Sequence, residues 1–167
     1  AYALLIDGAA SEIALIDVNK EKAKGEAMDL QHGLQFKPTT KIFFGSSYEL
    51  CKDAEIIVIS AGVHSKLGET RLELVSKNSA MFKEVIPKIT KYNKDCILLI
   101  VTNPLDVLTY LALKYSKFPK SRVFGSGTIL DTARFRYMLG EYFEVSPNSV
   151  HAYILGEHGD SSFPVWS

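Results

Sequence analysis

The chain has 167 residues, with 19 basic and 19 acidic side chains and a formal net charge of zero. Its 47% hydrophobic and 23% charged residues are close to the average of globular proteins, which excludes disordered and collagen-like chains. The balanced charge offers no broad basic surface for nucleic acid or anionic membranes. The length predicts one domain, with room for part of a second.

Neither a membrane span nor a signal peptide is visible in the sequence. The longest apolar runs, such as Cys96–Val101, are far shorter than the roughly 20 residues that cross a bilayer. No basic stretch followed by an apolar stretch and a cleavage site opens the chain. Cys51 and Cys96 are too few for a disulfide framework and too far apart for a CxxC site. We therefore expect buried, reduced thiols in a cytoplasmic protein.

Hydrophobic patterning predicts alternating strands and helices. The predictions in the first third of the chain are a helix end at Ala1–Ile6 stopped by Gly8, a strand at Glu12–Asp17, a helix at Asn19–His32, a strand at Lys41–Phe44 and a helical turn at Tyr48–Lys52. Those in the remainder are a strand at Glu55–Ser60, a loop at Val63–Gly68, a helix at Glu69–Tyr92, a strand at Cys96–Val101, a helix at Leu105–Tyr115, a strand at Arg122–Phe124, a helix at Asp131–Phe143 and a strand at Val150–Leu155.

Uninterrupted apolar strands separated by helices are typical of a parallel sheet covered on both faces, so the pattern predicts a doubly wound α/β fold. Such sheets bind ligands just beyond the carboxyl ends of their strands. In this chain Asp17, Ser60-Ala61-Gly62, Thr102-Asn103 and Gly125-Ser126-Gly127 occupy those places. The pattern thus indicates a nucleotide-sized crevice but no particular reaction.

Asp17 closes the first strand, where a carboxylate can accept both hydroxyls of an adenosine ribose. It can equally be a turn former or a partner of the next helix. A GxGxxG loop would decide for the nucleotide, but the chain has none. Gly125-Ser126-Gly127 lacks the third glycine and follows a late strand, so it is not that loop.

A second cluster of candidate residues lies near the end of the chain. Asp131 and Arg134 are three residues apart, which places them on one face of a helix. His158 lies between Gly156 and Gly159, where little packing surrounds it and substrate could approach. An exposed loop histidine is the simpler reading. A metal site of His151, Glu157, His158 and Asp160 is disfavoured by the spacing, and the GxSxG elbow of a hydrolase is absent.

Four motifs together resemble the L-lactate/malate dehydrogenase family, and the bacterial L-lactate dehydrogenases most closely. They are Gly156-Glu157-His158-Gly159-Asp160-Ser161, Leu130-Asp131-Thr132-Ala133-Arg134-Phe135-Arg136, Val101-Thr102-Asn103-Pro104 and Gly68-Glu69-Thr70-Arg71-Leu72. The resemblance covers the whole chain. It implies hydride transfer between NADH and pyruvate to give L-lactate. Malate, a bulkier 2-oxo acid, or a non-catalytic NAD-binding relative are the alternatives.

The resemblance also implies a role for each matching residue. His158 is the general acid and base, Asp131 orients its imidazole, and Arg134 binds the substrate carboxylate. Arg71 follows a mobile lid and would polarise the substrate carbonyl. Further substrate contacts are expected at Ser65, Asn103 and Asp131. Cofactor contacts are expected at Asp17, Lys22, Tyr48, Gly62, Val63, Val101, Thr102, Asn103 and Ser126, with NAD preferred over NADP because Asp17 would repel a 2′-phosphate.

Ser65 departs from the family pattern. At this lid position the lactate enzymes of the family carry Gln and the malate enzymes carry Arg. Serine provides no cation for the second carboxylate of oxaloacetate, and losing such a charge-assisted contact costs roughly 1.5–3 kcal/mol. Malate chemistry is therefore disfavoured, and the smaller side chain predicts relaxed selectivity among 2-oxo acids.

The resemblance further implies that the chain is an internal part of a longer protein. The expected fold is a Rossmann-like NAD-binding domain at residues 1–126 that lacks its first strand, followed by the start of an α+β substrate domain at residues 127–167. Without that central strand, its two neighbours would have unpaired edges.

A regulatory site is implied by Arg136 and His151. These residues match the pair that binds fructose 1,6-bisphosphate between subunits of the tetramer in allosteric bacterial lactate dehydrogenases. Ordinary surface or interface packing is the alternative.

Overall fold

The computed structural model describes residues 1–36, 40–63 and 71–166, except for the side chains of Phe36, Arg71, Leu72 and Trp166. The predicted loop at Val63–Gly68, with Ser65, therefore lies outside the described residues after Val63. The chain forms two compact units. The first is Ala1–Glu55 with Pro87–Cys96, and the second is Ile56–Ile86 with Ile97–Ser167.

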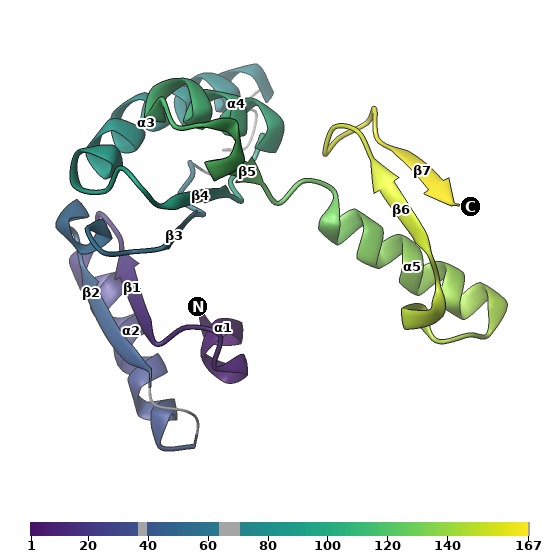
Figure 1. Cartoon of the computed structure of the whole chain (residues 1–167), viewed down its shortest axis with the longest axis horizontal. Coiled ribbons are helices and arrows are strands. Elements are labelled where there is room, and N and C mark those ends of the chain that lie inside the picture. Colours follow the sequence, from purple (N-terminus) through teal and green to yellow (C-terminus); the bar gives the residue numbers. More distant parts are fainter. Residues whose placement is uncertain (37–39, 64–70, 167) are drawn as a thin grey trace. The chain divides into compact units, whose positions relative to one another are not determined.

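The first unit contains two helices and a pair of strands (Figure 1). Their bounds are α1 (Tyr2–Asp7), β1 (Glu12–Ile16), α2 (Lys20–Gly33) and β2 (Lys41–Gly45), with 3-10 turns at Leu34–Phe36 and Tyr48–Cys51. Gly8 ends α1 as predicted, because its φ of 64° is in the left-handed region and its N–H donates to the carbonyls of Leu4 and Leu5. Asn19 caps α2 by accepting the N–H of Lys22.

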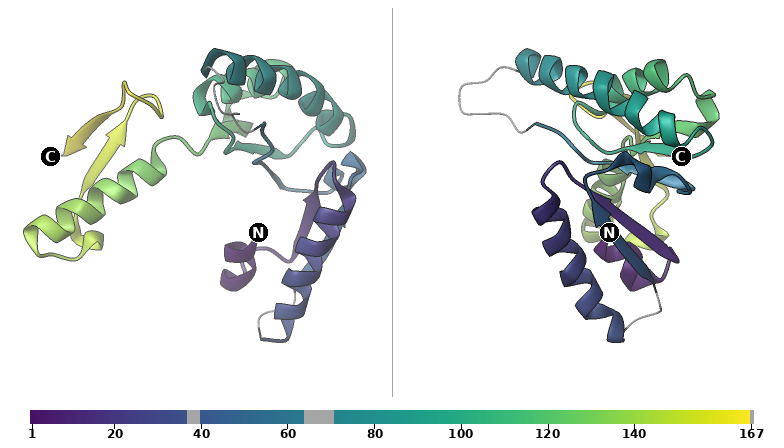
Figure 2. Two further views of the ribbon diagram at one scale, coloured as in Figure 1. Left: turned by 180° about the vertical axis from the view of Figure 1, so that it is seen from behind. Right: turned by 90° about the vertical axis from the view of Figure 1, so that its left-hand side faces the viewer.

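Strands β1 and β2 are parallel and pair from Glu12 opposite Lys41 to Ile16 opposite Gly45. Helix α2 runs alongside both strands in the two views of Figure 2, and it contacts both. Ala23, Ala27 and Leu30 recur at helical spacing along α2 and are buried. The core of this unit consists of Leu5, Ile13, Ala27, Leu30 and Ile42.

Both cysteines are free and buried in the first unit, as predicted. The side-chain amide of Asn93 ties their segments together, donating to the carbonyls of Cys51 and Ala54 at 2.8 Å and accepting the N–H of Cys96 at 3.0 Å. Burial, together with the nearby Cys96, raises the pKa of the Cys51 thiol to about 11. This thiol therefore stays protonated at neutral pH, which fits a packing role.

The second unit contains a three-stranded parallel sheet and, after it, a helix with an antiparallel strand pair. Their bounds are β3 (Ile56–Ile59), α3 (Arg71–Tyr92), β4 (Ile97–Ile100), α4 (Leu105–Ser116), β5 (Val123–Gly125), α5 (Ile129–Phe143), β6 (Ala152–Leu155) and β7 (Phe163–Trp166), with 3-10 turns at Lys120–Arg122 and Pro147–Ser149. The last residues of α3 belong to the first unit.

The parallel sheet has the order β3-β4-β5. Helices α3 and α4 lie on the same side of it in Figures 1 and 2, and α4 contacts β4 and β5. Gly125 allows this approach, because a Cβ there would lie 2.6 Å from the hydroxyl of Thr109 and 3.2 Å from Leu105. The side chains that point to the helices are buried, among them Ile59, Leu98 and Ile100.

The opposite face of this sheet corrects one expectation. Ile56 and Val58 are 56% and 49% exposed, and Phe124 is also exposed. Register pairs Val58 with Leu99 and Leu99 with Phe124, so these side chains share one face. The predicted parallel order is confirmed, but in the described residues helices cover only one face of β3-β4-β5.

The parallel strands form two sheets, because β1 pairs only with β2, and β3 only with β4, among the described residues. These are the unpaired edges that the sequence predicts for the two neighbours of a central strand.

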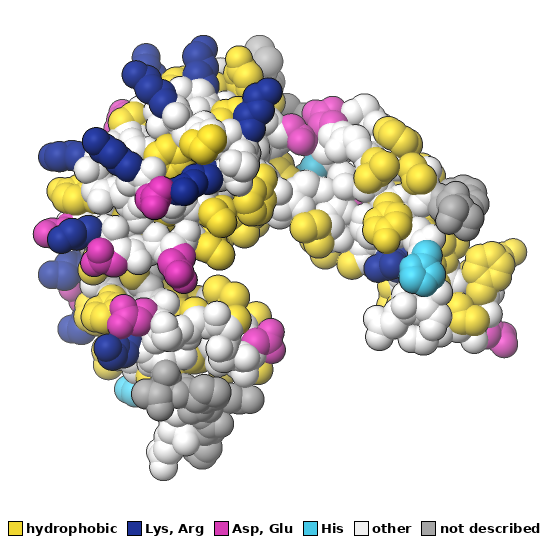
Figure 3. Space-filling model, in the orientation of Figure 1, with side chains coloured by type: hydrophobic (Ala, Val, Ile, Leu, Met, Phe, Trp, Pro, Cys, Tyr) yellow, Lys and Arg dark blue, Asp and Glu magenta, His cyan; other side chains and the backbone are white. Residues whose placement is uncertain are grey.

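Strand β7 was not predicted. It pairs antiparallel with β6, with Ile154 opposite Pro164. A proline inside a short apolar run argues against a strand, but a two-stranded ribbon leaves one side of each strand without partners and tolerates it. Hydrophobic side chains gather over the α5–β6–β7 segment on the face drawn in Figure 3. The largest exposed fractions there include those of Tyr142 (79%) and Ile129 (73%).

None of the helices in the described part of the chain combines the length and apolar character needed to cross a membrane.

Candidate active site

Near the start of α5, the carboxylate of Asp131 lies beside the guanidinium of Arg134. One carboxylate oxygen of Asp131, Oδ1, lies 3.7 Å from Nη1 of Arg134, which confirms the shared helix face predicted from the spacing. The side chain of Arg134 is 66% exposed, whereas that of Asp131 is only 26% exposed. The guanidinium is therefore accessible to an anionic ligand while its neighbour is held in place.

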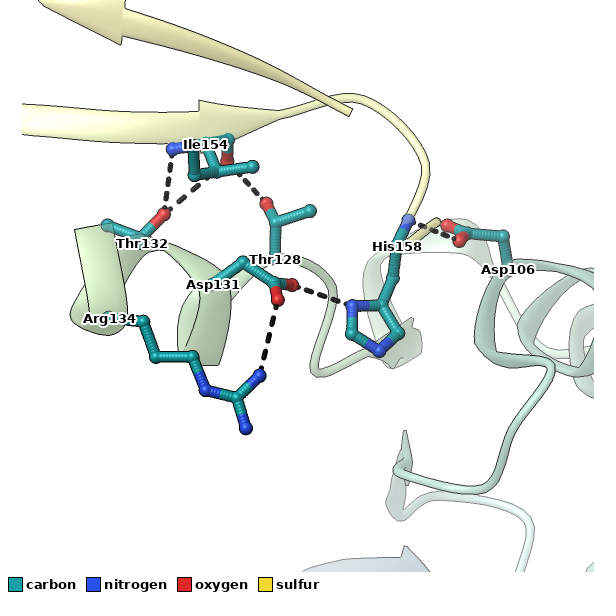
Figure 4. A network of polar contacts seen from close by, with 7 residues as sticks. All are labelled: Asp106, Thr128, Asp131, Thr132, Arg134, Ile154 and His158. Carbon is teal, nitrogen blue, oxygen red and sulfur yellow. Dashed lines mark hydrogen bonds and ion pairs between the residues drawn. The ribbon is translucent and has the colours of Figure 1, made fainter. Parts of the chain in front are cut away.

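The second oxygen of Asp131 binds the histidine predicted as catalytic. His158 lies in the loop between β6 and β7, and its Nδ1 is 2.6 Å from Oδ2 of Asp131 (Figure 4). The histidine side chain is 29% exposed. A carboxylate at this distance orients the ring and leaves Nε2 on the far side of the ring for a reacting group. His158 is thus no isolated surface histidine.

Two threonines of α5 hold β6 in the position that makes this contact possible. Thr128 donates to the carbonyl of Ile154 at 2.5 Å, and the hydroxyl of Thr132 accepts the N–H of Ile154 at 2.9 Å (Figure 4). Ile154 precedes His158 by four residues. The helix that carries Asp131 therefore also determines where the histidine loop begins.

The histidine loop has a second anchor outside α5. The backbone N–H of His158 donates to Oδ2 of Asp106, in the first turn of α4, at 2.9 Å. Sequence reasoning missed Asp106, because an acid in the first turn of a helix ordinarily indicates only favourable interaction with the helix dipole.

Strand ends β3 and β4 are joined by side chains that the sequence placed at a ligand-binding edge. The hydroxyl of Thr102 lies 3.1 Å from the carbonyl of Ile59 and 2.7 Å from that of Ala61. A Cβ on Gly62 would approach Thr102 to 2.7 Å, so glycine is required for this contact. The backbone at Gly62 thus lies closer to the methyl group of Thr102 than a residue with a Cβ would permit.

Asn78 of α3 is the second residue that the sequence did not reveal. It is 1% exposed, accepts the N–H of Val63 at 2.8 Å and donates to the carbonyl of Asn103 at 3.1 Å. The predicted contact residues Val63 and Asn103 are therefore fixed by the same buried amide. The side chains of Asn103, Val63 and Val101 remain exposed at this edge, and Ser126 is held there by its N–H, which donates to Ile100.

Asp17 is a turn former in the structure, and its role toward a ribose stays a prediction. It directly follows β1, and its Oδ1 accepts the N–H of Asn19 at 2.9 Å, which is the role of a turn former. Its Oδ2 lies 3.8 Å from Nζ of Lys22, and 36% of its side chain is exposed. A ribose hydroxyl can therefore still reach the carboxylate. Tyr48 begins the 3-10 turn that follows β2.

Comparison with known proteins decides the family. The model of the lactate/malate dehydrogenase NAD-binding domain matches residues 1–125, and that of the lactate/malate dehydrogenase α/β C-terminal domain matches residues 128–167. The chain belongs to the lactate/malate dehydrogenase family. The predicted resemblance and the Rossmann-like fold class are thereby confirmed, and the family's first domain binds NAD.

The lactate dehydrogenases of this family include near relatives of the chain. It is 54% identical over all 167 residues to L-lactate dehydrogenases of Acetivibrio thermocellus and Bacillus cereus, of which it covers 52% and 53%. It also superposes on the crystal structure of a lactate dehydrogenase from a Medee basin deep-sea metagenome library. That match has a TM-score of 0.94 and 50% identity and covers 99% of this chain and 53% of the other.

A ligand-bound crystal structure of the minor L-lactate dehydrogenase from Enterococcus mundtii matches with a TM-score of 0.95 and 45% identity, over 99% of this chain and 53% of that one. The chain thus spans about half the length of these dehydrogenases. The predicted boundary between residues 126 and 127 lies between the two family matches, and it stays a prediction.

Two of the predicted lid residues cannot be placed. Ser65 lies outside the described residues, and only the backbone of Arg71, the first residue of α3, is described.

Arg136, predicted as part of a regulatory site, lies in α5 with its Cζ 5.3 Å from the ring centroid of Tyr153. Its Nε is buried and has no hydrogen-bond partner among the described residues, and His151 is exposed just before β6.

Proposed function

We propose that the complete protein is an NAD-dependent L-lactate dehydrogenase of the cytoplasm, which interconverts pyruvate and L-lactate. The observation that carries this proposal is the 2.6 Å contact between Asp131 and His158, with Arg134 beside it on the same helix face. A fixed proton donor next to an accessible guanidinium suits a substrate that has a carbonyl and a carboxylate. The 54% identity to L-lactate dehydrogenases supports the same substrate class.

The reduced cofactor, NADH, would supply the hydride that adds to the substrate carbonyl carbon and would leave as NAD. Nε2 of His158 donates the proton to the carbonyl oxygen, and the carboxylate of Asp131 stabilises the imidazolium before the transfer. Arg134 holds the substrate carboxylate through parallel hydrogen bonds. In this proposal Asn103 contacts the same substrate, and Arg71 stabilises charge on the carbonyl oxygen as water is excluded.

The described residues suit the cofactor in three respects. Asp17 offers a partly exposed carboxylate at the end of β1, next to Lys22. Gly62, which follows β3, lies against the Thr102 side chain after β4, at the carboxyl ends of these strands where such sheets bind ligands. Val63 and Val101 are 42% and 43% exposed, which gives a flat nicotinamide apolar surface beside the polar Thr102, Asn103 and Ser126. We infer that these residues and Tyr48 form the cofactor site.

The test is oxidation of NADH by the complete gene product on addition of pyruvate. We expect turnover, and a loss of roughly 10²- to 10⁴-fold in kcat for His158→Gln with NADH binding retained, because only the proton donor is removed. NADH binding without oxidation in the parent protein would instead support the non-catalytic alternative. Replacing the exposed His32 by Gln provides a matched control of unchanged activity.

We further propose relaxed selectivity among 2-oxo acids, because Ser65 stands where lactate enzymes of the family carry Gln. The parent should accept 2-oxoisocaproate as well as pyruvate and should disfavour oxaloacetate. Ser65→Gln should raise the preference for pyruvate over 2-oxoisocaproate about tenfold by refilling the pocket. The measurement is kcat/KM on the three acids, and strict pyruvate preference in the parent would contradict this proposal.

We also propose a homotetramer activated by fructose 1,6-bisphosphate at Arg136 and His151. The buried, unpartnered Nε of Arg136 supports an anionic ligand, because a buried donor without an acceptor is costly. His151→Gln should diminish activation while His32→Gln leaves it intact, as measured by the bisphosphate concentration for half-activation. Unchanged activation in His151→Gln, or a monomer in sedimentation, would refute the site.

A further inference from the structure

Asp106 has no role in the proton transfer, substrate binding or cofactor binding proposed above, yet it contacts His158. Its Oδ2 accepts the backbone N–H of His158 at 2.9 Å, across 52 residues of sequence (Figure 4). A carboxylate that accepts a backbone N–H forms one of the stronger hydrogen bonds available to a loop. The contact therefore restrains the backbone of the residue whose ring must be placed most accurately.

The histidine loop contains two glycines, which allow its backbone more conformations than other residues would. Gly156 has a φ of 94°, a conformation that favours glycine, and Gly159 follows His158 directly. Within the loop, the hydroxyl of Ser161 donates to Glu157 at 2.7 Å. Apart from Asp106, Asp131 is the one described residue outside the loop that an identified hydrogen bond joins to His158, and it holds only the ring.

Asp106 lies on a part of the fold that buried side chains hold in place. Asp106 follows Asn103 by three residues and lies in the first turn of α4. Its neighbours Leu105 and Leu108 are buried, which holds this turn in place. The carbonyl of Asn103 is held by the buried Asn78. The carboxylate thus connects the histidine loop to the strand end that carries Asn103. Asp106 lies in the part matched by the NAD-binding domain, and His158 in the part matched by the C-terminal domain.

We propose that Asp106 is a positioning residue that sets the distance of the His158 imidazole from the strand end at Asn103. The proposal rests on the dehydrogenase function proposed above. Asp106 acts through its hydrogen-bond acceptor, which the backbone N–H of His158 requires, and its negative charge is secondary. Displacing a catalytic group by about 1 Å can cost roughly a hundredfold in rate, so the effect of losing this acceptor is measurable.

The test compares Asp106→Ala with Asp106→Asn in the complete gene product. Asp106→Ala should lower kcat/KM for pyruvate about tenfold to a hundredfold with the KM for NADH unchanged, because the histidine is displaced while the cofactor site is intact. Asp106→Asn keeps an acceptor oxygen and should restore activity to within about threefold of the parent. Asp29→Ala, which removes an exposed acid from α2, is the control of equal charge change.

A spectroscopic measurement makes the result independent of turnover. In protein labelled with ¹⁵N-histidine, the amide proton resonance of His158 should move upfield in Asp106→Ala, because a hydrogen bond is lost, and stay near its parent position in Asp106→Asn. An unmoved resonance in Asp106→Ala overturns the proposal, as does a kcat/KM within twofold of the parent. Equal losses in the Ala and Asn variants also overturn it, because they would assign the effect to charge.

If the proposed dehydrogenase function is wrong, the experiment gives a different result from the one that would overturn the role of Asp106. The parent protein would then bind NADH but not reduce pyruvate, while the His158 resonance still reports whether Asp106 holds the loop. Melting temperatures of both variants identify any loss that comes from unfolding.

Discussion

Asp131 uses its two carboxylate oxygens for two different partners, His158 at 2.6 Å and Arg134 at 3.7 Å. The first contact is short and partly buried, so it orients the imidazole. The second is longer, and its guanidinium is mostly exposed, so it leaves the donors of Arg134 available to a ligand. One side chain thus positions both the proton donor and the carboxylate-binding group.

Arg134→Lys should lower kcat/KM for pyruvate about tenfold to a hundredfold, mainly through a higher KM, because an ammonium cannot form the two parallel hydrogen bonds of a guanidinium. The measurement is steady-state kinetics with the complete gene product at saturating NADH. The exposed Lys24→Arg on α2 is the control for a Lys/Arg exchange and should be silent. Unchanged KM in Arg134→Lys would mean that another group binds the substrate carboxylate.

Among the individual residues of the site, the sequence revealed those whose partners are near in the chain or whose motif is distinctive. Asp131 and Arg134 are three residues apart on a helix, so their proximity was predictable. Asp106 and Asn78 were not found, because their hydrogen-bond partners lie 52 and 25 residues away. No local pattern distinguishes a side chain that binds a distant backbone from one that faces water.

Helix α5 and strand β6 act as one element because Thr128 and Thr132 bind both polar backbone groups of Ile154. This attachment transmits the position of α5 to the loop that follows β6. The element boundaries were largely predictable from apolar periodicity, but this attachment and strand β7 were not. Strand β7 was missed because Pro164 argues against a strand, and the apolar pattern of the sequence does not show which side of a strand is unpaired.

Thr132→Val should destabilise the protein by about 1–3 kcal/mol, because the N–H of Ile154 loses its acceptor without gaining water. Its kcat should fall as well, because the histidine loop is no longer held relative to Asp131. Thr90→Val is the matched control, because the hydroxyl of Thr90 bonds within its own helix, to the carbonyl of Pro87. This change should be within about 0.5 kcal/mol of neutral. Denaturant unfolding and kcat measure the two effects, and equal stability of the two variants would disprove the attachment.

At the scale of the whole chain, the parallel strands form two separate sheets, and β1 and β3 each have one edge unpaired among the described residues. Apolar side chains such as Ile56 and Val58 are also half-exposed. Both features indicate that the 167 residues bury too little apolar surface, and pair too few strand edges, to be stable by themselves.

The isolated 167-residue polypeptide should therefore melt without a cooperative transition and should bind NADH poorly. A far-UV circular dichroism melt and a fluorescence titration with NADH measure these two properties. The complete gene product is the control, and it should melt cooperatively and bind NADH. A cooperative melt with tight binding by the 167-residue chain would contradict the expectation.

The sequence by itself determined the order of strands and helices, the family and the residue types of the site, because these depend on local periodicity and on motifs of adjacent residues. The length of 167 residues suggested one nearly self-sufficient domain, yet the chain spans about half the length of its relatives. Only the tertiary structure showed that Asp106 and Asn78 hold the site and that one face of β3-β4-β5 is exposed. These features depend on contacts between distant segments, which form only when the chain folds.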